Sequence, residues 1–327
     1  MIIKRLLIGA VTLVAAGAAT VYGIQSANAA TYPGPGVVTG STFAHDPAMV
    51  KRPAGGYLLA VTAPGIGLKT STDRTAFADA GVAFPNGAPW TLPYTKGDTN
   101  LWAPDLTYRN GQYWLYYSAS SFGGNTSAIF LATSTTGAAG SWVNRGLVIE
   151  SRSTDTFNAI DPNLFIDGDG SWWLSFGSFW GGIKMIRLNG GTGLRTPTDT
   201  AVRPLAERFV NSKSVEAPFV YKRGGYYYLF VAFDLCCRGA SSTYRTMVGR
   251  AKSITGPYVD RNGTPMTAGG GTEIMATHDA VHGPGHPAVL RDGDQDVLIY
   301  HYYTPAGDAK LGINLLRWDS AGWPAAY

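Results

Sequence analysis

The sequence is short of cysteine. Its 327 residues include two cysteines, which are adjacent at Cys236 and Cys237. A scaffold stapled by several disulfides is therefore excluded, and the absence of C-x-x-C spacing argues against a zinc site. In an oxidising compartment the pair either closes a vicinal disulfide or stays as two thiols of a buried strand, and the sequence leaves both possibilities open.

Charge is also sparse. Charged residues make up 15% of the chain, with 26 Lys and Arg against 22 Asp and Glu. The sequence contains no run of basic residues and no basic nucleic-acid-binding motif. Because binding to a phosphate backbone requires clustered Lys and Arg, we exclude nucleic acid as a partner.

Long hydrophobic runs are missing except at the N-terminus. There, Lys4 and Arg5 precede an apolar run that ends near Val21, and a small-x-small cleavage site ends at Ala29. This pattern predicts a secretory signal peptide at residues 1–29 in preference to a membrane anchor, because the run is short and rich in Ala and Gly. We therefore expect a secreted, extracellular protein with no membrane association after cleavage.

Glycine, proline and aromatic residues, in contrast, are abundant. The chain has 42 Gly and 19 Pro, while 12% of its residues are aromatic and 45% are hydrophobic. Helix breakers at this density argue against a mostly helical protein. The apolar fraction excludes a disordered chain and is sufficient for a large core.

One sequence unit repeats five times. A polar or small residue is followed by Pro, a short apolar run, a Gly-containing turn and a strand rich in large apolar residues, and the prolines are Pro47, Pro104, Pro162, Pro218 and Pro287. Their spacings are 57, 58, 56 and 69 residues. Each unit supplies a hairpin and a third strand, which predicts an all-β fold, a five-bladed β-propeller, as a single domain over residues 30–327. A β-sandwich or a long β-barrel is the alternative, but neither is expected to repeat so regularly.

Two further expectations follow from the propeller. The strand near residues 315–318 is expected to close the ring by pairing with the N-terminal segment. Aromatic residues inside the strand patterns are expected to pack between blades.

The first strand of each unit begins at a chemically capable side chain. In a propeller these strands line the central channel, so their N-terminal ends meet at one mouth. The residues just before the repeated proline, or one position earlier, are Asp46, Trp102, Asp161, Glu216 and His286. A single carboxylate at such a position is usually a turn residue, but recurrence at equivalent positions favours a functional ring. Two carboxyl groups acting as acid and base cleave a glycosidic bond, and a third raises the pKa of the acid by like-charge repulsion.

Short motifs around these positions form an ordered set. They are His45-Asp46-Pro47, Trp102-Ala103-Pro104-Asp105, Asn158-Ala159-Ile160-Asp161-Pro162, Ser178-Phe179-Trp180-Gly181-Gly182-Ile183-Lys184, Glu216-Ala217-Pro218, Cys236-Cys237-Arg238-Gly239 and Gly283-Pro284-Gly285-His286. Each motif alone is common, but the ordered set resembles the five-bladed arabinanases of glycoside hydrolase family 43. The resemblance spans nearly the whole chain after the predicted signal peptide.

The resemblance implies an inverting hydrolysis of α-1,5-linked L-arabinofuranose. It assigns Asp46 as the general base, Glu216 as the general acid and Asp161 as the carboxylate that orients the acid and tunes its pKa. It implies that His286 helps to hold a hydrated calcium ion beneath the catalytic centre. The residues implied to line the sugar-binding groove are Trp102, Asn158, Ile160 and Ser178. Trp102 and Trp180 border loops and are better candidates for stacking on a sugar than the aromatic residues inside the strands.

Elementary chemistry agrees with part of this assignment. An inverting enzyme needs its two carboxyl groups roughly 6.5–9.5 Å apart, and blades one and four of a five-membered ring lie across the channel. A single imidazole is a poor calcium site, so an ion at His286 would need mainly water or carbonyl oxygens. A buried histidine satisfied by the backbone is the alternative for His286. His45 is expected to orient the base, and no role is assigned to His278, His282 or His301.

The sequence thus predicts a secreted, endo-acting glycoside hydrolase that acts as a monomer on plant cell-wall arabinan. Exo-acting arabinanase, arabinofuranosidase and β-xylosidase activities are the alternatives within the same family. A non-catalytic carbohydrate-binding propeller is an alternative from another class. Such a protein would repeat equivalent polar sugar sites in each blade, whereas the acidic residues here differ between units.

Overall fold

The computed structural model describes residues 32–327, which form one compact unit from Tyr32 to Tyr327. The signal peptide predicted for residues 1–29 lies outside the described residues. Within residues 32–327, no helix has the length and hydrophobicity needed to cross a membrane.

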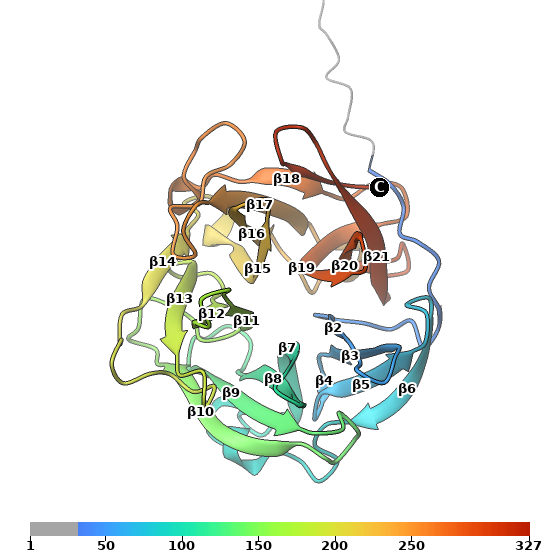
Figure 1. The fold of residues 1–327 in the computed structure, drawn as a ribbon, viewed down its shortest axis with the longest axis vertical. Coiled ribbons are helices and arrows are strands. Elements are labelled where there is room, and N and C mark those ends of the chain that lie inside the picture. The colour runs from blue at the N-terminus through green and yellow to red at the C-terminus, as the bar shows by residue number, and fades with distance from the viewer. Residues whose placement is uncertain (1–31) are drawn as a thin grey trace, which may run out of the picture. The chain divides into compact units, whose positions relative to one another are not determined.

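Five β-sheets are arranged around a central axis like the blades of a propeller (Figure 1). Blade one contains β1 (Thr39–Gly40), β2 (Ala48–Lys51), β3 (Tyr57–Val61), β5 (Gly67–Ser71) and β6 (Ala76–Val82). Blade two contains β4 (Ala63–Pro64), β7 (Asn100–Arg109), β8 (Gln112–Ala119), β9 (Ser127–Ser134) and β10 (Val143–Ser151). The prediction of an all-β, five-bladed β-propeller is confirmed.

The remaining blades have four strands each. Blade three contains β11 (Asn163–Ile166), β12 (Trp172–Phe176), β13 (Ile183–Leu188) and β14 (Arg203–Ala206). Blade four contains β15 (Val215–Arg223), β16 (Tyr226–Phe233), β17 (Arg245–Ala251) and β18 (Thr272–Met275). Blade five contains β19 (His282–Asp292), β20 (Gln295–Tyr303), β21 (Ala309–Trp318) and β22 (Pro324–Ala326). One short α-helix, α1 (Leu92–Thr95), precedes β7, and four single-turn 3-10 helices lie at Pro89–Thr91, Asn211–Lys213, Gly239–Ser241 and Met266–Ala268.

The ring is closed differently from the sequence prediction. The outermost strand of blade five is β22, which comes from the C-terminus and pairs with β21, while β1 from the N-terminal segment pairs with β6 of blade one. The N-terminal segment contacts β21 through separate hydrogen bonds, from Gly36 N to the Ile313 carbonyl, from Leu311 N to the Thr42 carbonyl, and from the side chains of Lys310 and Asn314. Residues 316–318 pair with β22 instead, so the expected pairing of this part of β21 with the N-terminal segment is not formed.

Five clusters of the hydrophobic core are each shared by two adjacent blades, and a sixth, smaller cluster lies within blade four. The cluster between blades two and three shows the pattern: Trp114 of β8 packs edge-on against Trp172 of β12, with ring centroids 4.9 Å apart. Equivalent clusters fill the other four blade interfaces. The strand aromatics thus pack between blades as predicted, and this packing fixes the blades around the axis.

The residue before each repeated proline adopts a left-handed backbone conformation. The φ angles are 51° at Asp46, 48° at Ala103, 57° at Asp161, 54° at Ala217 and 53° at His286. Residues other than glycine rarely adopt this conformation, which is concentrated at functional sites. In β7, β15 and β19 the pairing with the second strand shifts register at this point. Each innermost strand is therefore kinked where it begins to line the central axis.

Candidate active site

A cavity of about 830 Å³ lies over the N-terminal ends of the innermost strands. These strands follow one another around the axis in the order β2, β7, β11, β15, β19 and back to β2. All eight site residues predicted from the sequence line the cavity, namely Asp46, Trp102, Asn158, Ile160, Asp161, Ser178, Glu216 and His286. The repeat thus brings together residues that are up to 240 positions apart in the chain.

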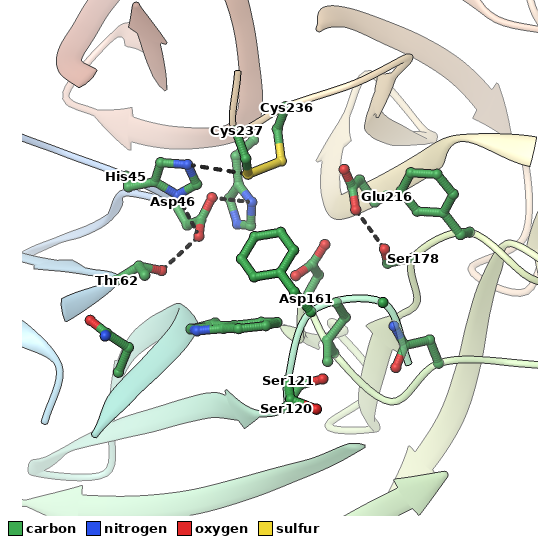
Figure 2. A pocket seen from close by; sticks show the side chains of 18 of the residues that line it. His45, Asp46, Thr62, Ser120, Ser121, Asp161, Ser178, Glu216, Cys236 and Cys237 are labelled. Carbon is green, nitrogen blue, oxygen red and sulfur yellow. Dashed lines mark hydrogen bonds and ion pairs between the residues drawn. A yellow bond between two sulfur atoms is a disulfide. The ribbon is translucent and has the colours of Figure 1, made fainter. Parts of the chain in front are cut away.

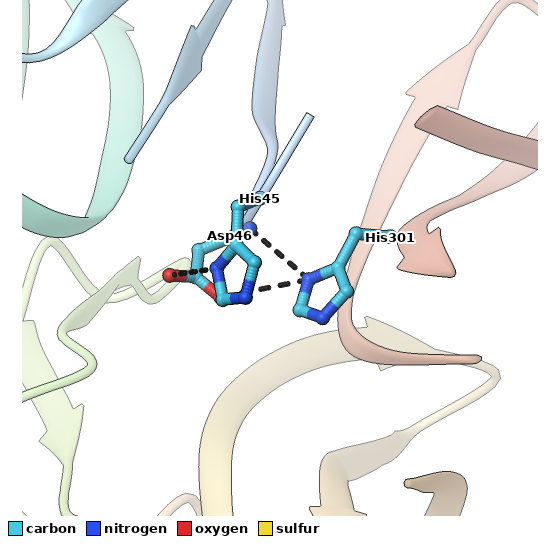
Figure 3. Close-up of side chains that lie close together, drawn as sticks. All are labelled: His45, Asp46 and His301. Atoms are coloured by element: carbon cyan, nitrogen blue, oxygen red, sulfur yellow. Dashed lines mark hydrogen bonds and ion pairs between the residues drawn. The ribbon is translucent and has the colours of Figure 1, made fainter. Parts of the chain in front are cut away.

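Asp46 is held by four polar neighbours. Thr62 Oγ1 donates a hydrogen bond to its Oδ2 at 2.6 Å, and His45 Nδ1 lies 2.9 Å from the same oxygen, off the line of an ideal hydrogen bond. His286 Nδ1 is 3.1 Å from Oδ1, and the Asp46 amide donates to Nδ1 of His301 at 3.1 Å (Figure 3). Burial would raise the pKa of Asp46, but the close contacts of its carboxyl group with the imidazoles of His45 and His286 outweigh burial and hold the pKa well below its usual range. Asp46 is therefore an ionised carboxylate.

Glu216 lies on the opposite side of the cavity from Asp46 (Figure 2). Ser178 Oγ donates to its Oε2 at 2.5 Å, and the Tyr244 hydroxyl donates to its Oε1. Burial raises the pKa of Glu216, and the negative charge of Asp46 raises it further, although the two hydrogen bonds oppose this shift. Glu216 therefore holds its proton at a higher pH than an exposed glutamate does.

Asp161 lies between these two carboxyl groups in Figure 2. Its Oδ2 accepts a hydrogen bond from the amide of Ala217 at 3.0 Å, one residue beyond Glu216. Burial raises the pKa of Asp161 well above its usual range, and the nearby charges of Glu216 and Asp46 add to the shift. The structure therefore joins Asp161 to the strand that carries the predicted acid.

His286 provides positive charge among these carboxyl groups. Burial would lower its pKa, but the charges of Asp46, Asp161 and Glu216 raise the pKa to about 9. His286 uses Nδ1 toward Asp46, which leaves Nε2 for another ligand. A cation held by this nitrogen and otherwise by water would take the place of the Nε2 proton, because a metal-ligating imidazole is neutral.

A metal site made entirely of protein ligands does not suit calcium here. Within residues 32–327, one group of side chains close enough to share an ion consists of His45, Asp46 and His301. It offers two nitrogens and one carboxylate, and Nδ1 of His301 already accepts a hydrogen bond from the Asp46 amide. Because calcium takes six to eight oxygen ligands, this group is not a calcium cage.

Two of the predicted sugar-contacting residues have geometry that suits binding. The ring of Trp102 is 5.1 Å from the ring of Phe122, which is 78% exposed. Asn158 is buried, and its Oδ1 accepts no hydrogen bond from the residues that the structure describes. An unpaired acceptor on a cavity wall suits a sugar hydroxyl, because a buried polar group without a partner is costly. Ile160 is a buried part of the same wall.

Sequence reasoning missed several residues of the site. His301 was assigned no role, yet it is fully buried against Asp46, and Thr62 and Tyr244 were not singled out. The repeat could have indicated Thr62 and His301, because polar residues recur at the end of the second strand of a unit. Thr62, Ser118 and His301 each accept the amide of a left-handed residue in the next blade. Tyr244 carries no such signal, because a long loop places it.

Cys236 and Cys237 form a vicinal disulfide on the cavity wall (Figure 2). The structure thus selects one of the two possibilities that the sequence left open. Cys237 Sγ is 3.7 Å from Nε2 of His45.

Comparison with known proteins agrees with this architecture. Residues 37–324 match the family model "Glycosyl hydrolases family 43". The chain is 44% identical over 287 residues to an extracellular endo-α-(1→5)-L-arabinanase of Bacillus subtilis, covering 86% of this chain and 87% of that protein. It is 40% identical over 296 residues to an extracellular exo-α-(1→5)-L-arabinofuranosidase of Cellvibrio japonicus, covering 86% and 85%.

A solved structure is also similar to this chain over most of its length. The endo-arabinanase of Bacillus licheniformis superposes with a TM-score of 0.83 at 46% identity, covering 88% of this chain and 99% of that one. The family match extends over most of the propeller and includes every strand that contributes to the cavity. The chain therefore belongs to glycosyl hydrolase family 43.

Proposed function

We propose that this glycoside hydrolase is a secreted endo-α-1,5-L-arabinanase that cleaves plant arabinan with inversion at the anomeric carbon. Family membership and 44% identity to a protein named as an extracellular endo-arabinanase support the substrate, the mode of action and the location. The observation that best supports this reaction is the pair of buried carboxyl groups of Asp46 and Glu216. They lie on opposite sides of the cavity, and their pKa values are shifted in opposite directions. Such a pair is suited to act as base and acid at the same pH.

In the proposed reaction, Asp46 takes a proton from a water molecule whose oxygen attacks the anomeric carbon. At the same time Glu216 gives its proton to the glycosidic oxygen, so the bond between that oxygen and the anomeric carbon breaks in a single displacement. Asp46 ends protonated and Glu216 ends ionised, and exchange with solvent restores both. The two groups lie on opposite sides of the cavity in Figure 2, which supports a mechanism in which water attacks from the side away from the leaving group.

The surroundings of both groups support these roles. The contacts of Asp46 with Thr62, His45 and His286 stabilise the carboxylate form that a base requires. The hydroxyls of Ser178 and Tyr244 fix the direction of the Glu216 carboxyl group. Asp161 supports the acid through the Ala217 amide, so we assign it as a positioning residue.

We further propose that His286 can hold a hydrated calcium ion through Nε2. A bound ion would supply positive charge beneath the three carboxyl groups, a role that the imidazolium form of His286 also fills. Asp46 and Asp161 are near enough to favour a hydrated dication electrostatically. If the ion is needed, a chelator removes activity and calcium restores it. Full activity in excess chelator, with no calcium detected by elemental analysis, would reject the ion.

Exo action is the second candidate, because a similar protein of Cellvibrio japonicus is named as an exo-acting enzyme. The two modes differ in the first products from linear arabinan. An endo enzyme releases mixed oligosaccharides early, whereas an exo enzyme releases a single short product from the start. Sampling the first few per cent of conversion by chromatography distinguishes them.

The same reaction followed by NMR tests the mechanism. Inversion at an α-linked substrate gives a β-configured product first, before mutarotation. An initial α-product would require a covalent intermediate and would reject single displacement by Asp46 and Glu216. Lack of any hydrolysis by the purified protein would favour a carbohydrate-binding propeller.

A further inference from the structure

A line of polar contacts runs from the vicinal disulfide to the predicted base. The amide of Cys237 donates a hydrogen bond to the Tyr303 hydroxyl oxygen at 3.0 Å, and that hydroxyl is 2.9 Å from Nε2 of His45. On the other side of the imidazole, His45 Nδ1 is 2.9 Å from Oδ2 of Asp46 (Figures 2 and 3). Neither Tyr303 nor the disulfide is used by the reaction described above.

The backbone amide of Cys237 can only donate, so the Tyr303 oxygen accepts from it and the Tyr303 hydroxyl hydrogen remains available for donation to Nε2 of His45. Burial raises the pKa of Tyr303 to about 12, so this hydroxyl keeps its hydrogen. When Tyr303 donates to Nε2, His45 is a neutral imidazole whose hydrogen is on Nδ1, which faces Asp46.

The oxidised state of the cysteines matters for this arrangement. Cys237 Sγ is 3.7 Å from Nε2 of His45, and a disulfide sulfur carries no hydrogen. A free thiol at the same position would compete with Tyr303 to donate to Nε2, or would pass its proton to the imidazole. Either change would alter the hydrogen that His45 presents to Asp46.

The disulfide also belongs to a loop that is otherwise tied down. The amide of Thr243 donates to the carbonyl of Leu235 at 2.8 Å, and the amide of Arg238 donates to Ser242 Oγ at 2.9 Å. Between these ties, Cys237 has a left-handed φ of 64°, which a residue other than glycine adopts only when its surroundings hold it. The bond to Cys236 restricts the one residue whose amide reaches Tyr303.

We propose that the Cys236–Cys237 disulfide, Tyr303 and His45 form a positioning unit that holds Asp46 as the general base. The proposal rests on the proposed function, because it concerns the base of that reaction. It predicts that opening the disulfide lowers kcat through Tyr303 and His45, and not only by changing the wall of the sugar-binding cavity.

The test combines reduction with a Tyr303→Phe substitution. A water-soluble phosphine reduces the disulfide to two thiols, with a thiol count to show completion, and a melting curve shows that the fold persists. We expect kcat on linear arabinan to fall on the order of tenfold when the wild-type disulfide is reduced, a size usual for coupled residues of one hydrogen-bond network.

Tyr303→Phe is expected to cause a similar loss of kcat with the disulfide intact, and reduction of that variant is expected to cause little further loss. The matched control, Tyr302→Phe, changes a neighbouring hydroxyl outside the cavity lining and should respond to reduction as the wild type does.

Two kinetic outcomes would overturn the proposal. One is a kcat that reduction leaves unchanged, and the other is a reduced Tyr303→Phe variant whose loss of kcat is the product of the two separate losses. If reduction unfolds the protein, the Cys236→Ala, Cys237→Ala double variant replaces it in the same comparison. A second readout does not depend on hydrolysis. Nitrogen-15 NMR of the histidine rings should show His45 with hydrogen on Nδ1 in the oxidised protein, and a changed signal after reduction. Hydrogen on Nε2 in the oxidised protein would contradict the proposal even if the arabinanase activity is absent.

Discussion

The amide of Ala217 donates a hydrogen bond to Oδ2 of Asp161 at 3.0 Å, and this bond joins blade three to the residue that follows Glu216. Ala217 has a left-handed φ of 54°, so its amide points away from the regular ladder and toward the neighbouring blade. Asp161 therefore acts on Glu216 through the backbone. The raised pKa of Asp161, caused by burial and by the nearby carboxylates, favours the neutral form of this side chain.

This relationship predicts different effects for two substitutions of Asp161. Asp161→Asn keeps an acceptor for the Ala217 amide and resembles a neutral acid, whereas Asp161→Ala removes the acceptor. We expect the Asn variant to retain a kcat on the order of tenfold above that of the Ala variant, because a lost partner leaves a buried amide unpaired. Initial rates on linear arabinan measure this difference. Equal losses in the two variants would show that Asp161 acts by its negative charge instead.

Glu216→Gln tests the general acid. The amide cannot give a proton to the leaving oxygen, so kcat on arabinan should fall by about 10²–10⁴-fold. An aryl arabinofuranoside with a good leaving group needs little protonation, so the variant should retain far more of its activity on that substrate. Glu207→Gln, which lies outside the cavity lining, is the matched control and should behave as the wild type on both substrates. A loss of the same size on both substrates would argue that Glu216 is not the acid.

The fold and the ring of charged side chains could both be predicted from the sequence, because both depend on the repeat. The prolines mark the kinks at which the innermost strands begin, and Asp46, Asp161 and His286 occupy the kinked positions themselves. Glu216 is one position earlier, with Ala217 at the kink, which explains why the predicted ring needed two positions.

Contacts made by residues of the loops could not be predicted from the sequence. Tyr244 reaches Glu216 from a loop, and Cys237 reaches Tyr303 across 66 positions of the chain. No periodicity sets these contacts, because they depend on loop conformations that are peculiar to one blade. His301 was recoverable in principle from its position near the end of a second strand, as Thr62 was, but only by aligning the blades in register.

His286 should control the lower pH limit of activity. Its positive charge and hydrogen bond help to lower the pKa of Asp46 against the opposing effect of burial. Removing the cation in His286→Gln should raise the pKa of Asp46, so that the base becomes protonated at higher pH. The acidic limb of the profile of kcat/KM, which reports the base of the free enzyme, should therefore move to higher pH.

The control for this profile is His282→Gln, because His282 lies on the same strand but does not line the cavity. Its acidic limb should coincide with that of the wild type. A limb that stays in place in His286→Gln, or that moves to lower pH, would contradict the electrostatic role of His286. Profiles should be recorded with and without added calcium, because either cation supplies charge at this position.

Substitution of Asn158 should weaken sugar binding without lowering the stability of the fold. Its buried Oδ1 lacks a hydrogen-bond donor among the described residues, so the folded protein carries an unsatisfied polar group that a sugar hydroxyl can satisfy. Asn158→Ala should therefore lower kcat/KM on arabinan by about tenfold or more, because a lost hydrogen bond of 1.4 kcal/mol corresponds to that factor, while the melting temperature does not fall.

Asn125→Ala is the informative comparison, because the Asn125 amide donates to the carbonyls of Asp155 and Phe157 at 3.0 Å each. That variant should lose stability because it leaves two carbonyls without their donor. A melting temperature that falls as far for Asn158→Ala as for Asn125→Ala, with unchanged kcat/KM, would mean that Asn158 supports the fold rather than the sugar.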